Sequence, residues 1–116
     1  MKIAKITYKK PLFTEILHYN SSSITLTDAP KDNNGEGKFL SPTDMVATSL
    51  GSCMMTIIGI YCLKNNIQIN NLSCEVSKTM SSKPRKIESI AINMDLSTSL
   101  SESDKHLNKI EDLAKN

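Results

Sequence analysis

The chain has 116 residues, of which 39% are hydrophobic and 22% are charged, a composition typical of a soluble globular protein rather than a disordered one. Its length predicts one domain over residues 1–116. The formal net charge of +2 predicts no general affinity for nucleic acids or membranes, and the few aromatic residues argue against a base-stacking surface.

The first residues and the cysteines bear on the cellular compartment. The segment MKIAKITYKK alternates too strongly and carries too many lysines for the apolar core of a signal peptide. Without an export signal, the expected compartment is the reducing cytoplasm, where Cys53, Cys62 and Cys74 are thiols. The most apolar stretch, 45–63, could span a membrane by its length, but a buried central helix explains it as well.

The first third of the chain predicts strands. Alternating residues predict strands in 2–8, 12–19 and 23–29, with a turn-rich link at 20–23. The polar segment 30–40 contains glycines, asparagines and a proline, and it predicts a loop. Such a loop is either a plain connection or the mouth of a neighbouring site.

A long helix is predicted from Ser41 to about Leu63. Ser41 suits the N-cap, Pro42 suits the first helical position, and Asp44 has the spacing of a capping box. The helix is apolar on nearly every side, so we expect it to be covered all round.

The last part of the chain predicts a hairpin and a second helix. Strands are expected in 71–78 and 90–96, on either side of a turn at 81–86, and apolar residues recur at helical spacing in 101–116. Strands followed by a helix, a hairpin and a helix indicate an α+β fold with mostly antiparallel pairing.

The three thiols are not equivalent. Cys74 on an apolar strand face and Cys62 in the long helix are expected to be core residues. Cys53 and Cys62 are nine residues apart, roughly 13 Å along the helix axis and half a turn around it, too far for a disulfide. Cys53 itself is either a small core residue or a nucleophile. Its neighbours Gly51 and Ser52 are small, so a substrate or another segment could approach it closely.

The segment DAPKDNNGEGKFLSPTDMVATSLGSCMMTIIGIYCLKNNI resembles the core of the OsmC/Ohr family, the osmotically inducible and organic-hydroperoxide-resistance proteins, in its OsmC-like branch. The most specific part is the SPTDMV…SLGSC block, which holds Cys53 in mid-helix. The hairpin CEVSKTMSSKPRKIESIAINMDL agrees in order and spacing, so the resemblance covers essentially the whole chain. It implies an OsmC-like fold with a long central helix and a second helix, in which two chains intertwine as a homodimer.

The resemblance also implies a thiol-dependent peroxidase with its active sites at the dimer interface. The Cys53 thiolate would attack an organic hydroperoxide or hydrogen peroxide, release alcohol or water, and become a sulfenic acid. In the family a second cysteine then closes a disulfide that a cellular thiol reduces. Asp44 would be a supporting acid. Arg85 is a candidate for the activating cation, with a solvated turn charge as its alternative role.

The chain departs from the family pattern in several places. Phe13 stands where related sequences carry an arginine, and Arg85 is the only arginine in the chain. Some members have a glutamate ten residues before the cysteine, where this chain has Thr43. The family's Cys-Pro motif and closing strand would be expected after Asn116, so the chain is either a shortened copy or an incomplete sequence.

Two functions are therefore carried forward. The first is the peroxidase, with a second copy, a small hydroperoxide and an external thiol as partners, and with neither nucleic acid nor membrane. The second is a non-enzymatic dimer that binds a small apolar ligand or acts as a scaffold, which the missing arginine and second cysteine favour. No cofactor is implied, and no Cys/His spacing resembles a metal-ligand set. His18 and His106 are expected at the surface.

Overall fold

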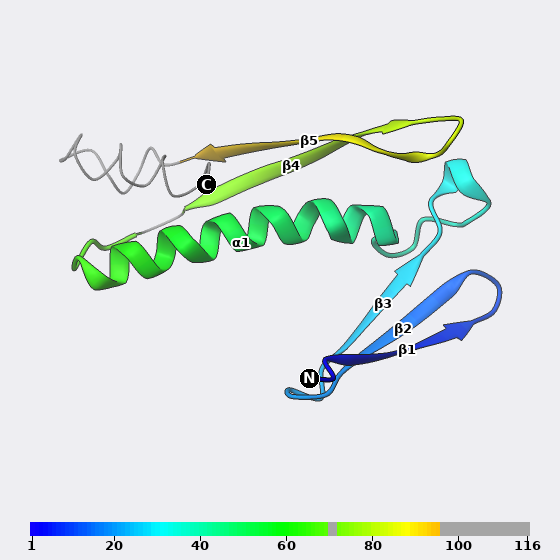
Figure 1. The fold of residues 1–116 in the computed structure, drawn as a ribbon, viewed down its shortest axis with the longest axis horizontal. Helices are drawn as coiled ribbons and strands as arrows, with labels where there is room; N and C mark the ends of the chain where they lie inside the picture. The colour runs from blue at the N-terminus through cyan, green and yellow to red at the C-terminus, as the bar shows by residue number, and fades with distance from the viewer. Residues whose placement is uncertain (70–71, 96–116) are drawn as a thin grey trace. The chain divides into compact units, whose positions relative to one another are not determined.

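The computed structural model describes residues 1–69 and 72–95, with elements in the order β1, β2, β3, η1, α1, β4 and β5 (Figure 1). They fall into two compact units, Met1–Val46 and Ala47–Asn116, each described here by itself. All strand pairing is antiparallel in the described part of the chain, which confirms the predicted α+β class. The helix predicted in 101–116 lies outside the described residues, and the single domain stays a prediction.

Three strands form the sheet of the first unit. The sheet order is β1 (Ala4–Lys9), β2 (Phe13–His18) and β3 (Ile24–Asp28), with β2 in the middle. The register places Ile6 opposite Ile16. Short turn-rich links join successive strands, so antiparallel neighbours are the natural outcome. All three strands predicted from alternation are confirmed, with ends that differ by at most two residues.

The segment from 30 to 40 is a loop, as predicted. It contains one short 3-10 turn, η1 (Lys31–Asn33). The two ends of the loop are joined because the Asp28 amide donates a hydrogen bond to the Leu40 carbonyl at 3.2 Å. The chain therefore returns to the end of β3 before the long helix begins.

Helix α1 spans Pro42–Lys64, close to the predicted bounds. Ser41 Oγ accepts a hydrogen bond from the Asp44 amide at 3.1 Å, and Asp44 Oδ2 accepts one from the Ser41 amide at 3.1 Å. This is the reciprocal capping box that the spacing predicted, and it satisfies two amides that the helix itself leaves unpaired.

Strands β4 (Ser73–Ser81) and β5 (Lys86–Asp95) form a hairpin that is longer than predicted. The second strand was predicted from residue 90, whereas β5 begins four residues earlier, at Lys86. A register shift between Thr79 and Met80 absorbs the extra residue and lets pairing continue to the turn.

The core of the second unit lies between α1 and the chain that follows it. Ile58 and Cys62 are its fully buried members, and partly buried residues pack against them: Tyr61, Ile67, Ile69, Leu72 and Met94. The buried residues of α1 share one face of the helix: Ala47, Gly51, Ile58 and Cys62. Within the described residues of this unit, the cover on every side that was expected from the sequence is not found, since Leu50 and Ile60 are exposed.

Candidate functional site: an exposed thiol on helix α1

The side of α1 on which the Cys53 side chain lies follows from the contacts at Gly51, two residues before it. A Cβ atom added to Gly51 would lie 2.8 Å from Val76 Cγ2 and 3.5 Å from Cys74 Sγ, so this face of α1 lies directly against the hairpin. Two residues further along an α-helix is a rotation of roughly 200°. Cys53 therefore faces away from the hairpin, and its side chain is exposed.

Aliphatic residues surround Cys53 on this face of the helix. Positions three and four residues away are neighbours on a helix surface, and those of Cys53 include Leu50 and Ile57. Ile60 lies one turn beyond Ile57, and Leu50 and Ile60 are 44% and 49% exposed. We call these four residues the outer stripe of α1: Leu50, Cys53, Ile57 and Ile60. The thiol thus lies among apolar side chains on a face of α1 that the described part of the unit leaves exposed.

The other two thiols have different surroundings. Cys62 is 1% exposed, which confirms it as a core residue, and burial raises the pKa of its thiol. Cys74 is half-buried and faces Gly51 on the hairpin side of α1. All three cysteines are free thiols. Neither Cys62 nor Cys74 lies on the face that carries Cys53, so neither is placed to attack a sulfenic acid there within one chain.

This difference predicts the order of alkylation. At neutral pH, iodoacetamide should modify Cys53 first, Cys74 next and Cys62 last, because access and thiolate fraction both limit the reaction. The raised pKa of Cys62 means that its labelling should increase as the pH rises above neutral. Peptide mass spectrometry after a brief exposure measures the order, and a urea-denatured sample should lose it. Labelling of Cys62 as fast as Cys53 in the folded protein would contradict this arrangement.

The structure does not bring Arg85 to Cys53 within one chain. Arg85 lies in the hairpin turn, beyond Ser81. Val76, which faces Gly51, is five residues before Ser81, a distance of roughly 17 Å along a strand. Cys53 also lies on the helix face opposite the hairpin. An electrostatic role for Arg85 at this thiol therefore requires a second chain.

The other residues singled out from the sequence have structural partners. The Asp44 carboxylate accepts the capping hydrogen bond from Ser41. Phe13, at the position where relatives carry an arginine, packs edge to face against Phe39 with ring centroids 6.1 Å apart. His18 was expected at the surface and is half-buried at the end of β2, where its Nδ1 shares a hydrogen bond with Ser21 Oγ at 2.6 Å. His106 lies outside the described residues.

Two features were missed from the sequence. The outer stripe was not recognised, because helical spacing identifies it only once the contact of Gly51 with the hairpin gives the orientation of α1. Lys78 is a half-buried cation on the inner face of β4, between Val76 and Met80, and the strand alternation already placed it there.

Metal and membrane sites were also considered. Within residues 1–69 and 72–95, no group of three His, Cys, Asp or Glu side chains could hold a metal ion. Helix α1 is long and apolar enough to cross a membrane by length and composition. The core helix of a soluble protein meets the same two criteria, so this property alone is weak evidence for a membrane span.

Comparison with known proteins identifies the class. The family model described as OsmC-like protein matches residues 35–116. A crystal structure from Psychrobacter arcticus, of a protein named for osmotic stress induction and a detoxification response, is 39% identical with a TM-score of 0.91 and is matched over 98% of this chain and 82% of that chain. The chain therefore belongs to the OsmC-like family, which confirms the resemblance and the α+β fold with one long helix expected from it, while the intertwined homodimer stays a prediction.

More distant structures share the fold. An OsmC-like protein from Mycoplasma pneumoniae has a TM-score of 0.77 at 16% identity, over 99% of this chain and 81% of that chain. An organic hydroperoxide resistance protein OsmC from Legionella pneumophila has a TM-score of 0.67 at 15% identity, over 99% and 81%. No curated protein matches the chain.

Proposed function

We propose that the protein is a cytoplasmic thiol-dependent peroxidase that reduces organic hydroperoxides or hydrogen peroxide through Cys53. The observation that carries the proposal is the exposure of this thiol on an apolar helix face, while Cys62 is buried and Cys74 half-buried. Membership of the OsmC-like family supports a role in stress or redox chemistry, and the 39% identical Psychrobacter protein is named for a detoxification response.

The proposed reaction uses the sulfur of Cys53 as the nucleophile. Its thiolate attacks one peroxide oxygen, the O–O bond breaks, and the other oxygen leaves as an alcohol or water after taking up a proton. The sulfur is oxidised by two electrons to a sulfenic acid and the peroxide is reduced. An external thiol then displaces the sulfenic oxygen as water and forms a mixed disulfide, and a second thiol releases Cys53 reduced.

Asp44 and Arg85 have supporting roles in this proposal. Asp44 would orient a cation or a water molecule from the first turn of α1, in addition to its capping role. Arg85 would raise the thiolate fraction of Cys53 as a nearby cation, acting from a second chain. The apolar neighbours Leu50 and Ile57 favour a hydroperoxide with an organic group over a purely polar substrate.

Hydroperoxide consumption by the purified protein tests the proposal. Without a reductant, the reduced protein should consume about one equivalent of hydroperoxide, because no other thiol is placed to resolve Cys53. Addition of an excess of thiol should give continuous turnover, measured by the loss of hydroperoxide. A comparison of a monothiol with a dithiol shows which class completes the cycle. Absence of consumption under all three conditions would favour the second function.

The second function is a non-enzymatic dimer that binds a small apolar ligand or acts as a scaffold. The observation that favours it is the Phe13–Phe39 pair, which fills with aromatic rings a position where relatives carry an arginine. An apolar fluorescent probe displaced by apolar compounds, in a protein without peroxide consumption, would support this function.

We also propose that the protein is a homodimer and that the outer stripe of α1 belongs to its interface. Large aliphatic side chains such as Leu50 and Ile60 are exposed in the single chain, and contiguous exposed apolar surface marks interaction sites. A second copy would provide the cover that the first chain lacks, and it would enclose Cys53.

Substitution of Ile60 with aspartate tests the homodimer. Ile60→Asp should weaken self-association at least about tenfold, because a charge would be buried at the interface. Sedimentation over a range of protein concentrations measures the dissociation constant. Asn93→Asp, which adds the same charge to the exposed face of β5, is the control and should leave association unchanged. A stable monomer of the unmodified protein at micromolar concentration would exclude the dimer.

A further inference from the structure

The loop before α1 contains the one Asn-Gly dipeptide of the chain, Asn34-Gly35. In a flexible peptide this dipeptide is open to deamidation, because a glycine has no side chain to hinder its amide nitrogen. The Gly35 nitrogen attacks the side-chain carbonyl carbon of Asn34, a C–N bond forms, and the side-chain amide leaves as ammonia. Water then opens the succinimide to aspartate or isoaspartate, with no net oxidation or reduction.

The folded loop opposes each requirement of this reaction. Asn34 is left-handed, with φ 73° and ψ 1°, and this ψ turns the Gly35 nitrogen away from the side chain that it would attack. The Gly35 amide donates a hydrogen bond to the Pro30 carbonyl at 3.0 Å. A Cβ atom on Gly35 would lie 1.7 Å from the Ala29 carbonyl oxygen, so the Gly35 backbone packs directly against that of Ala29.

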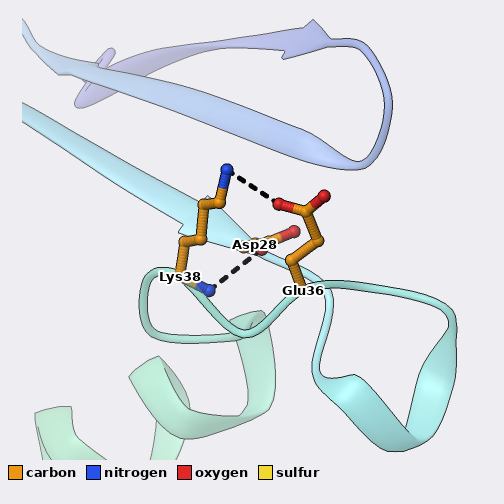
Figure 2. A network of polar contacts seen from close by, with 3 residues as sticks. All are labelled: Asp28, Glu36 and Lys38. Atoms are coloured by element: carbon orange, nitrogen blue, oxygen red, sulfur yellow. Dashed lines mark hydrogen bonds and ion pairs between the residues drawn. The ribbon is translucent and has the colours of Figure 1, made fainter.

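A buried carboxylate holds this loop closed. Asp28, at the end of β3, is 1% exposed, and its Oδ2 accepts a hydrogen bond from the Lys38 amide at 3.0 Å. Figure 2 shows this bond together with the ion pair between Lys38 Nζ and Glu36 Oε2, 2.8 Å long. Hydrogen bonds to an ionised carboxylate are among the stronger ones, whereas exposed ion pairs contribute little. Of these two contacts, the hydrogen bond from the Lys38 amide to Asp28 Oδ2 therefore contributes more to the stability of the folded loop.

We propose that Asn34 is a deamidation site that the Asp28 carboxylate keeps closed, so that modification proceeds only from an open state of the loop. The aspartate or isoaspartate formed at residue 34 would persist, because the ammonia that leaves is lost to solvent. Isoaspartate adds a carbon to the backbone at a residue whose left-handed conformation shapes the turn. The same loop ends at Leu40, next to the capping Ser41, so the modification would disturb the segment that leads into α1. This inference is independent of the proposed peroxidase activity.

The rate of deamidation at Asn34 tests the proposal. Folded protein and urea-denatured protein are incubated at mildly alkaline pH, and the peptide that contains Asn34 is followed by mass spectrometry. Loss of the Asp28 bond should raise the population of the open loop, so Asp28→Ala should deamidate about tenfold faster than the folded wild type. Asp28→Asn, a neutral acceptor of the same shape, should be intermediate. Glu36→Gln, which removes only the exposed ion pair, should match the wild type.

Two results would overturn the proposal. One is equal deamidation in the folded and denatured wild type, which would mean that the loop gives no protection. The other is a wild-type rate in Asp28→Ala while circular dichroism shows a folded protein. If Asp28→Ala does not fold, the isosteric Asp28→Asn decides, and an unchanged rate in that variant contradicts the role of the carboxylate.

Discussion

Replacement of Cys53 with serine should abolish hydroperoxide consumption, whereas Cys62→Ala and Cys74→Ala should retain it. A serine hydroxyl is not oxidised by peroxide, so the variant loses the atom that accepts the oxygen. Dimedone, which reacts with sulfenic acids, should form an adduct at Cys53 after one equivalent of hydroperoxide and none in Cys53→Ser. Excess peroxide should instead yield the sulfinic acid at this residue. Peptide mass spectrometry identifies both products.

The other two thiols provide the control for this experiment and the result that would contradict it. Cys62→Ala removes a buried group and should lower the free energy of unfolding by about 1 kcal/mol, so its activity is measured at a temperature where it is folded. An intrachain Cys53–Cys62 or Cys53–Cys74 disulfide after one equivalent of peroxide would mean that these thiols are not where the structure places them. Full activity of Cys53→Ser would move the nucleophile to another residue.

The elements of the fold could be predicted from local patterns, but the covered faces could not. Alternation predicted the strands, and Ser41 with Asp44 predicted the start of α1 through a capping box. In β3, however, Thr27 is 2% exposed while Leu26 is 38% exposed, the reverse of a simple hydrophobic assignment. A period of two identifies which residues share a face, and only the neighbouring segments decide which face is covered.

The side of the helix on which Cys53 lies could not be predicted from the sequence for the same reason. A helix that is apolar on nearly all sides has no polar face from which its direction can be predicted. The contact between Gly51 and Val76 supplies that direction, because it assigns one face of α1 to the hairpin and leaves Cys53 on the other. Spacing along one chain likewise could not relate Arg85 to Cys53, since a contact across two chains, as proposed for this pair, leaves no spacing pattern in the sequence.

The two glycines of α1 should respond in opposite ways to alanine. Gly51→Ala should lower the free energy of unfolding by about 1–2 kcal/mol, because its methyl group would lie 2.8 Å from a stiff valine side chain, and overpacking outweighs the gain in helix propensity. Gly59→Ala should raise it by up to about 1 kcal/mol, because a Cβ there meets no neighbouring atom of residues 1–69 and 72–95 within 4 Å. Urea unfolding followed by circular dichroism measures both changes.

The same pair of variants separates contacts within the chain from contacts between chains. The loss in Gly51→Ala arises inside one unit, so it should not depend on protein concentration, whereas the stability of a dimer does. If Gly59→Ala instead destabilises the protein and weakens its association, a second chain lies against Gly59. A Gly51→Ala variant that is as stable as the wild type would contradict the packing of α1 on the hairpin. The two variants thus report on different sides of the helix: Gly51 on the side that packs on the hairpin, and Gly59, roughly 80° around the helix from it, on a side where a second chain could lie.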